Sequence, residues 1–180
     1  MLYTRKGDGG DTSFFGSPER VRKDSPRTEA LGALDELNSL LGVCKTHPSA
    51  EKFRAGGMTF AHALADIQQT LFIAQAELAG APKTVSEEKV TALEQLVNSI
   101  EAELPLIKTF SVPGGSGFSA TLDYARAVAR RTERRVVSVT DVEIGAHTRS
   151  YLNRISSALF AFARLANARS GIKEEPPTYR

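Results

Sequence analysis

Stripes of apolar residues at helical spacing run through most of the chain after residue 26. Leucines recur three and four residues apart in TEALGALDELNSLLG, and a longer stripe continues from Phe60 to Leu78. This spacing places apolar side chains on one face of an α-helix. Such a face is stable only when it packs against another element. The stripes therefore predict helices packed on helices and no convincing sheet.

Glycines and prolines divide the stripes into about five helices. We expect helices over about 27–47, 60–78, 86–104, 118–138, and from 141 or 145 to 170. Gly80 and Pro82 end one of them, Pro105 ends another, and Gly171 is a C-cap for the last. The expected fold is all-α: a five-helix antiparallel bundle in one domain, 1–180, with an extended glycine-rich N-terminal segment, 1–26. The tail, 172–180, is expected to be mobile in the free protein.

Composition narrows the class of protein. Twenty-three basic and 21 acidic residues leave a net charge of +2, too balanced for a general nucleic-acid binder. The single cysteine, Cys44, cannot form an intramolecular disulfide, which suits a reducing compartment. No apolar run approaches the ~20 residues that span a bilayer, and the N-terminus lacks the apolar core of an export signal. A cytoplasmic protein without nucleic-acid or membrane partners is expected.

The segment TRKGDGGDTSFFGS combines closely spaced glycines with hydroxyl and basic side chains. Glycines let consecutive backbone N–H groups form a nest for an anion, and Asp8 and Asp11 are candidates to hold a hydrated cation. The segment is neither a Walker A motif nor a dinucleotide fingerprint. Composition alone favours a flexible tail, although Phe14 and Phe15 argue against a fully solvated one. Both interpretations stay open.

An arginine-rich stretch, LDYARAVARRTERRVV, lies within an expected helix. Arg126, Arg130 and Arg134 are spaced by four and therefore line one side of it. Five arginines meet only Asp123 and Glu133 within the segment, so either a phosphate-bearing partner or a solvated face with salt bridges explains them.

Just before that helix, FSVPGGSG is either an anion site at a helix N-terminus or a loop that needs glycine backbone angles. The three histidines have no ligand partner at metal spacing, and no catalytic triad can be nominated.

Five blocks in order carry a resemblance to a known family: YTRKGDGGDTSFFG, RVRKDSPRTEALGALDELNSLLG, FSVPGGS, ARAVARRTERRVV and YLNRISSALFAFAR. Together they resemble the PduO-type ATP:cob(I)alamin adenosyltransferases over roughly residues 3 to 167. The resemblance implies transfer of the 5′-deoxyadenosyl group of ATP to the cobalt of cob(I)alamin, giving adenosylcobalamin and triphosphate. It also implies Mg²⁺ with ATP, a five-helix bundle, and a homotrimer with active sites between subunits. A cobalamin reductase or an adenosylcobalamin-dependent client enzyme is a further expected partner.

The resemblance also transfers functional roles to matching positions. Phe110 matches the aromatic residue that packs under the corrin and keeps the lower base off cobalt. Asp35 and Arg126 match residues that pair across the subunit boundary. The implied nucleotide contacts are Thr4, Arg5, Lys6, Gly7, Thr12, Ser13, Lys23, Arg130, Arg131, Glu133, Arg134 and Asn153. No protein metal site is implied.

The sequence differs from the family pattern at two places, and two other functions remain as alternatives. The loop GDGGDTS has one extra residue relative to the family, and Ile155-Ser156-Ser157 replaces the usual Leu-Ser-Asp. One alternative is a phosphoryl transferase on the same bundle, which needs an acidic base near the γ-phosphate. The other is a non-catalytic ATP- or cobalamin-binding carrier or sensor. The N-terminal segment is expected to be half of an ATP site and poorly ordered until ATP binds.

Overall fold

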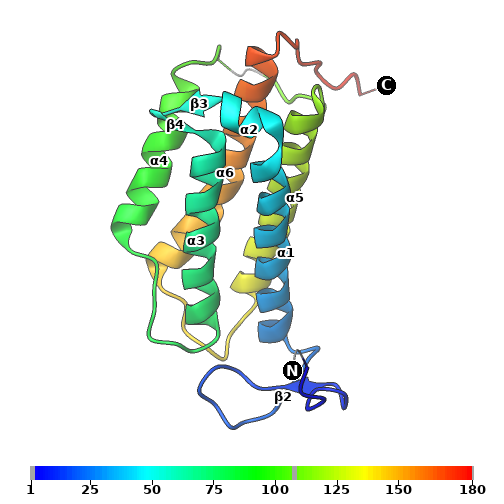
Figure 1. Cartoon of the computed structure of the whole chain (residues 1–180), viewed down its shortest axis with the longest axis vertical. Coiled ribbons are helices and arrows are strands. Elements are labelled where there is room, and N and C mark those ends of the chain that lie inside the picture. The colour runs from blue at the N-terminus through cyan, green and yellow to red at the C-terminus, as the bar shows by residue number, and fades with distance from the viewer. Residues whose placement is uncertain (1–2, 107–108, 180) are drawn as a thin grey trace.

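A computed structural model of the protein describes residues 3–106 and 109–179. Within those residues six helices and four two-residue strands are formed (Figure 1). In chain order they are β1 (Asp11–Thr12), β2 (Val21–Arg22), α1 (Pro26–Thr46), α2 (Pro48–Lys52), β3 (Arg54–Ala55), β4 (Met58–Thr59), α3 (Phe60–Leu78), α4 (Glu87–Glu101), α5 (Gly117–Val137) and α6 (Ala146–Arg169).

The prediction of a mostly helical chain is confirmed, but the connections hold more regular structure than expected. The break after α1 contains α2, which Pro48 begins and whose Ser49 amide is capped by the His47 imidazole. Gly56 and Gly57, both at positive φ, then form the two-residue turn of a β3–β4 hairpin. The N-terminal segment is not simply extended either, because β1 pairs antiparallel with β2.

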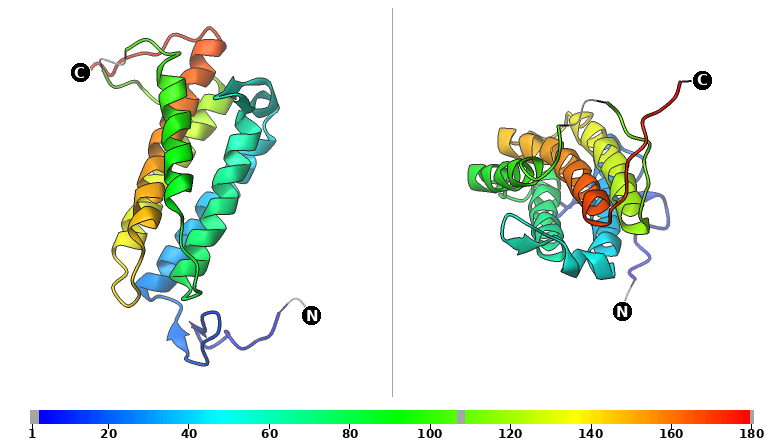
Figure 2. Two further views of the ribbon diagram at one scale, coloured as in Figure 1. Left: turned by 90° about the vertical axis from the view of Figure 1, so that its left-hand side faces the viewer. Right: turned by 90° about the horizontal axis from the view of Figure 1, so that it is seen from above.

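The five long helices alternate in direction along the molecule (Figures 1 and 2). α1 packs against α3 and α5, and α6 packs against α5 and α4. Three of these pairs are antiparallel, whereas α4 runs parallel to α6. The expected antiparallel bundle is therefore corrected at α4, because the chain crosses from α3 to the far side of α6 before it turns back.

Helix α6 is the most enclosed element, with fourteen buried residues out of 24. Phe162 of α6 packs on Phe60 with ring centroids 4.6 Å apart, and Phe118 of α5 lies 6.3 Å from Phe60. Cys44 is also buried, and this burial raises the pKa of its thiol to about 11. Among the described residues, no helix is both long and apolar enough to cross a membrane.

The start of α6 is held by a carboxylate from another helix. Its N-cap is Gly145, which has no side chain to accept a hydrogen bond. Glu77, almost fully buried near the end of α3, accepts from the Gly145 amide at 2.6 Å and from the Thr148 hydroxyl. Side chains of neighbouring elements cap helix ends in this way when the helix itself supplies none. α6 is thereby anchored two turns before Asn153.

Candidate functional site

The N-terminal segment lies beyond the start of α1, at one end of the bundle (Figure 1). Two basic side chains hold it in shape by binding its backbone carbonyls: Lys23 Nζ donates to Gly7 O at 2.7 Å, and Arg20 donates to Lys6 O. A Cβ atom at Gly7 would lie 3.0 Å from Lys23 Nζ, so this approach favours glycine. Of the predicted nucleotide residues, Gly7 and Lys23 are thus brought together.

Asp11 in this segment has a partner that the sequence did not indicate. Arg20 forms an ion pair with its carboxylate, and this hydrogen-bonded guanidinium lowers the pKa of Asp11. Asp11 is therefore engaged with Arg20 rather than grouped with Asp8 around a cation. The described residues contain no cluster of three metal-ligating side chains.

The segment is joined to the bundle through an aromatic contact. The guanidinium of Arg27 lies 4.0 Å from the ring centroid of Phe14, while its Nε donates to Leu78 O at 2.7 Å. This contact explains one of the two phenylalanines that argued against a solvated tail; Phe15 is exposed. The remaining predicted residues of the segment lie at or near its surface: Thr4, Arg5, Lys6, Thr12 and Ser13.

Four predicted residues meet in a polar pocket between α5 and α6. The pocket has a volume of about 280 Å³ and is lined by Arg130, Glu133, Arg134, Val137 and Asn153. Asn153 Nδ2 donates to Glu133 at 2.7 Å, so Glu133 is bound to α6 rather than to Arg130. Two arginines therefore face one carboxylate, which leaves the pocket positively charged and suited to an anion.

A larger groove, which we call the apolar groove, adjoins this pocket. It has a volume of about 620 Å³ and lies over α6 between α4 and α5. Among the described residues, Arg126 and Arg130 are the cationic side chains that line it, and Arg126 Nε is buried there with no hydrogen-bond partner. Its other lining residues are Val97, Glu101, Leu104, Pro105, Leu106, Ser156, Ser157, Phe160 and Ala161. Arg130 lines both cavities, so the polar pocket and the apolar groove lie next to each other.

Other predicted residues are not gathered at these cavities. Arg131 forms an ion pair at 2.5 Å with Glu36 of α1. One arginine of the arginine-rich stretch therefore has a structural role. Asp35 is exposed on α1 and has no hydrogen bond or ion pair to the rest of the described chain. Because the predicted pairing of Asp35 with Arg126 is between subunits, it stays a prediction.

Phe110 lies in the connection between α4 and α5. That connection joins the ends of α4 and α5 that lie opposite the N-terminal segment (Figure 2). The side chain of Phe110 is 81% exposed. The glycine-rich turn that follows has a structural explanation: Gly115 has φ +101°, and a Cβ there would lie 2.4 Å from Asn167 Oδ1. Of the two interpretations of FSVPGGSG, the loop that requires glycine is supported.

Sequence reasoning missed the apolar wall of the groove. Phe160 belongs to the block YLNRISSALFAFAR, and its ring centroid lies 5.9 Å from the Arg126 guanidinium, but no role was assigned to it from the sequence. Leu104 and Leu106 follow the end of α4, where no periodic pattern marks them. Only their placement across from α5 makes them part of a cavity.

Comparisons with known proteins identify the family of the chain. Residues 2–166 match the family model described as cobalamin adenosyltransferase. The corrinoid adenosyltransferase of Bacillus subtilis is 40% identical over 95% of this chain and 89% of its own length. The corrinoid adenosyltransferase PduO of Salmonella typhimurium is 39% identical over 91% of this chain, which spans about half (48%) of that longer relative.

A solved structure is similar over the whole fold. It is a phenylalanine-to-histidine variant of the PduO-type ATP:corrinoid adenosyltransferase from Lactobacillus reuteri, complexed with cobalamin and ATP. The TM-score is 0.89 at 28% identity, over 99% of this chain and 97% of that one.

Proposed function

The chain belongs to the cobalamin adenosyltransferase family, and we propose which of its residues and which assembly perform the reaction. It is an ATP:cob(I)alamin adenosyltransferase, which transfers the 5′-deoxyadenosyl group of ATP to cobalt and yields adenosylcobalamin and triphosphate. The observation that carries the residue assignment is the meeting of the polar pocket and the apolar groove at Arg130.

The reaction explains why no nucleophilic side chain is needed. The cobalt(I) electron pair attacks C5′ of the ribose, a Co–C bond forms, and the C5′–O bond breaks with its electron pair leaving on triphosphate. The protein has to orient C5′ over cobalt and to stabilise the negative charge of the leaving group. We assign triphosphate to the polar pocket, where Arg130 and Arg134 supply charge and Asn153 supplies an amide. The apolar groove offers the neighbouring surface for the corrin.

We propose that the N-terminal segment completes the nucleotide site of a neighbouring subunit. Within the described chain, no hydrogen bond or ion pair joins that segment to Arg130 or Arg134. Its exposed Thr4, Arg5 and Lys6 therefore have room for a ligand from outside. The five long helices would be the family's five-helix bundle, assembled as a homotrimer in which Asp35 of one subunit pairs with Arg126 of the next. The unpartnered Arg126 Nε supports that pairing.

A mixing experiment tests the shared site. Lys23→Ala and Arg130→Ala each remove one half of it, so trimers of either variant alone should lose most activity. Co-expressed subunits should recover part of it, because a site between them combines an intact segment with an intact arginine. No recovery would place both halves in one chain. Asp35→Asn should weaken assembly by analytical ultracentrifugation, and a fully active trimer would remove Asp35 from the site.

We propose that Mg²⁺ enters with ATP. Mg²⁺ is usually held by one or two carboxylates together with substrate phosphates. Glu133 is the carboxylate that lines the polar pocket, and its contact with Asn153 orients it there. When bound, the ion would neutralise part of the phosphate charge, and the arginines would neutralise the rest.

We assign to Phe110 the exclusion of the lower base from cobalt. An axial nitrogen makes the cobalt(I) state hard to reach, so an apolar ring on that face favours reduction. Phe110 is exposed in the single chain, which leaves its ring available to a corrin.

The activity is tested with ATP and chemically reduced cob(I)alamin under anaerobic conditions. Loss of the cob(I)alamin spectrum with stoichiometric triphosphate is the expected result. ADP as the product would identify a phosphoryl transferase instead, and binding of both substrates without turnover would identify a carrier or sensor.

We further propose a cytoplasmic location, with a cobalamin reductase or an adenosylcobalamin-dependent client enzyme as partner.

A further inference from the structure

The chain after α6 returns to the connection that carries Phe110. α6 ends in a tight turn, with Gly171 at φ +68° and the Ile172 amide donating to Asn167 O at 3.0 Å. Three residues later the Glu175 carbonyl accepts a hydrogen bond from the Val112 amide at 2.8 Å. The tail and the Phe110 loop (residues 109–116) thus lie side by side at the same end of the bundle (Figure 1).

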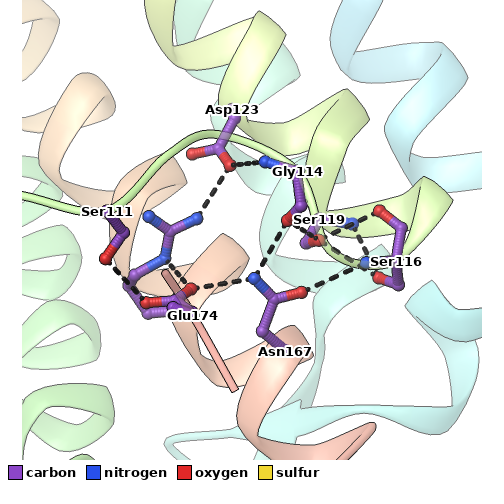
Figure 3. A network of polar contacts seen from close by, with 8 residues as sticks. Ser111, Gly114, Ser116, Ser119, Asp123, Asn167 and Glu174 are labelled. Atoms are coloured by element: carbon purple, nitrogen blue, oxygen red, sulfur yellow. Dashed lines mark hydrogen bonds and ion pairs between the residues drawn. The ribbon is translucent and has the colours of Figure 1, made fainter. Parts of the chain in front are cut away.

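The side chain of Glu174 bridges the loop and α6 (Figure 3). Its Oε1 accepts from Asn167 Nδ2 at 2.8 Å and lies 2.5 Å from Arg164 Nε, an ion pair whose geometry falls outside that of a hydrogen bond. Its Oε2 accepts from the Ser111 hydroxyl at 3.1 Å. One carboxylate therefore joins a helix of the core to the residue directly after Phe110.

The helix side of this bridge is buried and charged. The side chains of Arg164 and Asp123 are both 4% exposed, and Arg164 Nη2 donates to Asp123 Oδ2 at 2.7 Å. The same Oδ2 accepts from the Gly114 amide at 3.2 Å. A buried guanidinium requires partners for its charge, and here one carboxylate comes from α5 and the other from the tail.

The loop is consequently held at two points after Phe110. Ser111 is bound by Glu174, while Gly114 is bound through its amide by Asp123 and through its carbonyl by Asn167 Nδ2 at 3.0 Å. Phe110 stands immediately before this anchored stretch. Because its ring is 81% exposed, packing within the described chain does not set its position, and the backbone anchors must do so.

We propose that Glu174 is a positioning residue for Phe110: it fixes the loop through Ser111 and Arg164, and so sets where the ring meets the corrin. This inference rests on the proposed role of Phe110. Without the bridge the ring samples more positions, so a smaller fraction of bound cobalamin loses its lower base. The nucleotide half of the site is unaffected, because Arg130 lies about 10 Å further along α5 than Asp123.

The test compares Glu174→Ala with Glu175→Ala, adjacent variants with the same loss of charge. Glu175 holds Val112 through its backbone carbonyl, which alanine retains. We expect kcat to fall about fivefold to tenfold in Glu174→Ala, with the KM for ATP within about twofold of the wild type. The kcat of Glu174→Gln should lie between those of the wild type and Glu174→Ala, because the amide oxygen of glutamine still accepts a hydrogen bond from Ser111.

A spectroscopic measurement separates positioning from a general structural effect. Cobalt(II) with an axial nitrogen shows nitrogen splitting in its EPR spectrum, and displacement of the base removes it. With ATP and cob(II)alamin bound, Glu174→Ala should retain more of this splitting than the wild type or Glu175→Ala. Equal base displacement in both variants would overturn the proposal, even where kcat differs.

A milder variant keeps the proposal testable if Glu174→Ala does not fold. Ser111→Ala removes only the hydroxyl that Glu174 binds on the loop, and it should shift base displacement in the same direction by about twofold to threefold. If Ser111→Ala behaves as the wild type while Glu174→Ala unfolds, Glu174 is structural only and the proposal fails. If Phe110→Ala itself leaves base displacement unchanged, the assigned role of Phe110 fails, which is a separate result.

Discussion

The two ends of the bundle use the same kind of ion pair in opposite surroundings. In the N-terminal segment, the side chains of Arg20 and Asp11 are 38% and 41% exposed. At the other end, Arg164 and Asp123 are each 4% exposed. Water screens the first pair and leaves it exchangeable, whereas the second pair is enclosed, and loss of Asp123 would leave the buried Arg164 with Glu174 as its remaining ion-pair partner. The first end suits a segment that must rearrange around a ligand, and the second suits a fixed support for a loop.

The largest effect should come from breaking the buried pair. Asp123→Ala leaves Arg164 without its α5 partner and frees the Gly114 amide, so we expect a loss of about 3–5 kcal/mol of unfolding free energy in chemical denaturation. Asp11→Ala is the matched control from the exposed pair, and its unfolding midpoint should stay close to the wild type. Equal losses in the two variants would remove the contrast between the ends.

The next effect concerns the polar pocket, which we propose to hold triphosphate. Arg130→Ala should lower kcat/KM for ATP by roughly 10-fold to 150-fold, the equivalent of about 1.5–3 kcal/mol for a charge-assisted contact. Arg149→Ala, an exposed arginine of α6 outside the pocket lining, is the control. Unchanged ATP dependence in Arg130→Ala would eliminate the assigned phosphate contact.

A smaller and more selective effect is expected at the Phe110 end. Phe110→Ala should slow turnover with cob(II)alamin plus reductant on the order of tenfold, while ATP binding measured by calorimetry stays unchanged. The physical reason is that, in the role we propose, the ring acts on the cobalt face and not on the nucleotide. A variant with the normal rate would show that the two ends do not divide the two substrates in this way.

The smallest effect is a change of titration in the N-terminal segment. Arg20 lowers the pKa of Asp11, so the ion pair is intact above the ordinary carboxyl value of about 3.9 and is lost as the pH falls through the lower folded value. In Arg20→Gln, the pKa of Asp11 followed by NMR should rise toward the ordinary value. The pKa of Asp24, which Arg22 lowers, is the internal control and should not move. A rise in the pKa of both carboxyls would indicate that the substitution changes the conformation of the whole segment.

Periodicity predicted the long helices well because it reports local geometry. The stripe from Phe60 to Leu78 coincides with α3, and the last expected helix ends within a residue of α6. It missed α2 and the β3–β4 hairpin, since elements of two to five residues are too short to show a period. It also gave no reason for α4 to run parallel to α6, which depends on how the chain crosses the bundle.

The candidate site was predicted only in part, because some of its contacts join residues that are far apart in the sequence. The spacing of Arg126, Arg130 and Arg134 placed them on one side of a helix, and two of the three line the groove. Within that segment Asp123 and Glu133 were the only acidic residues near the arginines, whereas Glu133 accepts a hydrogen bond from Asn153 on the next helix. A partner twenty residues away cannot be chosen from spacing within one helix.

The amino-acid sequence by itself determined the helices, the charges along them and the family resemblance, because each depends on residues that are neighbours in the chain. The tertiary structure alone decided which charges are satisfied and which remain available. Arg164 and Asp123 are 41 residues apart, and Ser111 and Glu174 are 63 apart. Their pairing follows from the packing of α5 on α6 and the return of the tail, and burial there converts ordinary surface residue types into a fixed support. Arg130 and Arg134 form no ion pair within the described residues, and they are the arginines that we propose for phosphate.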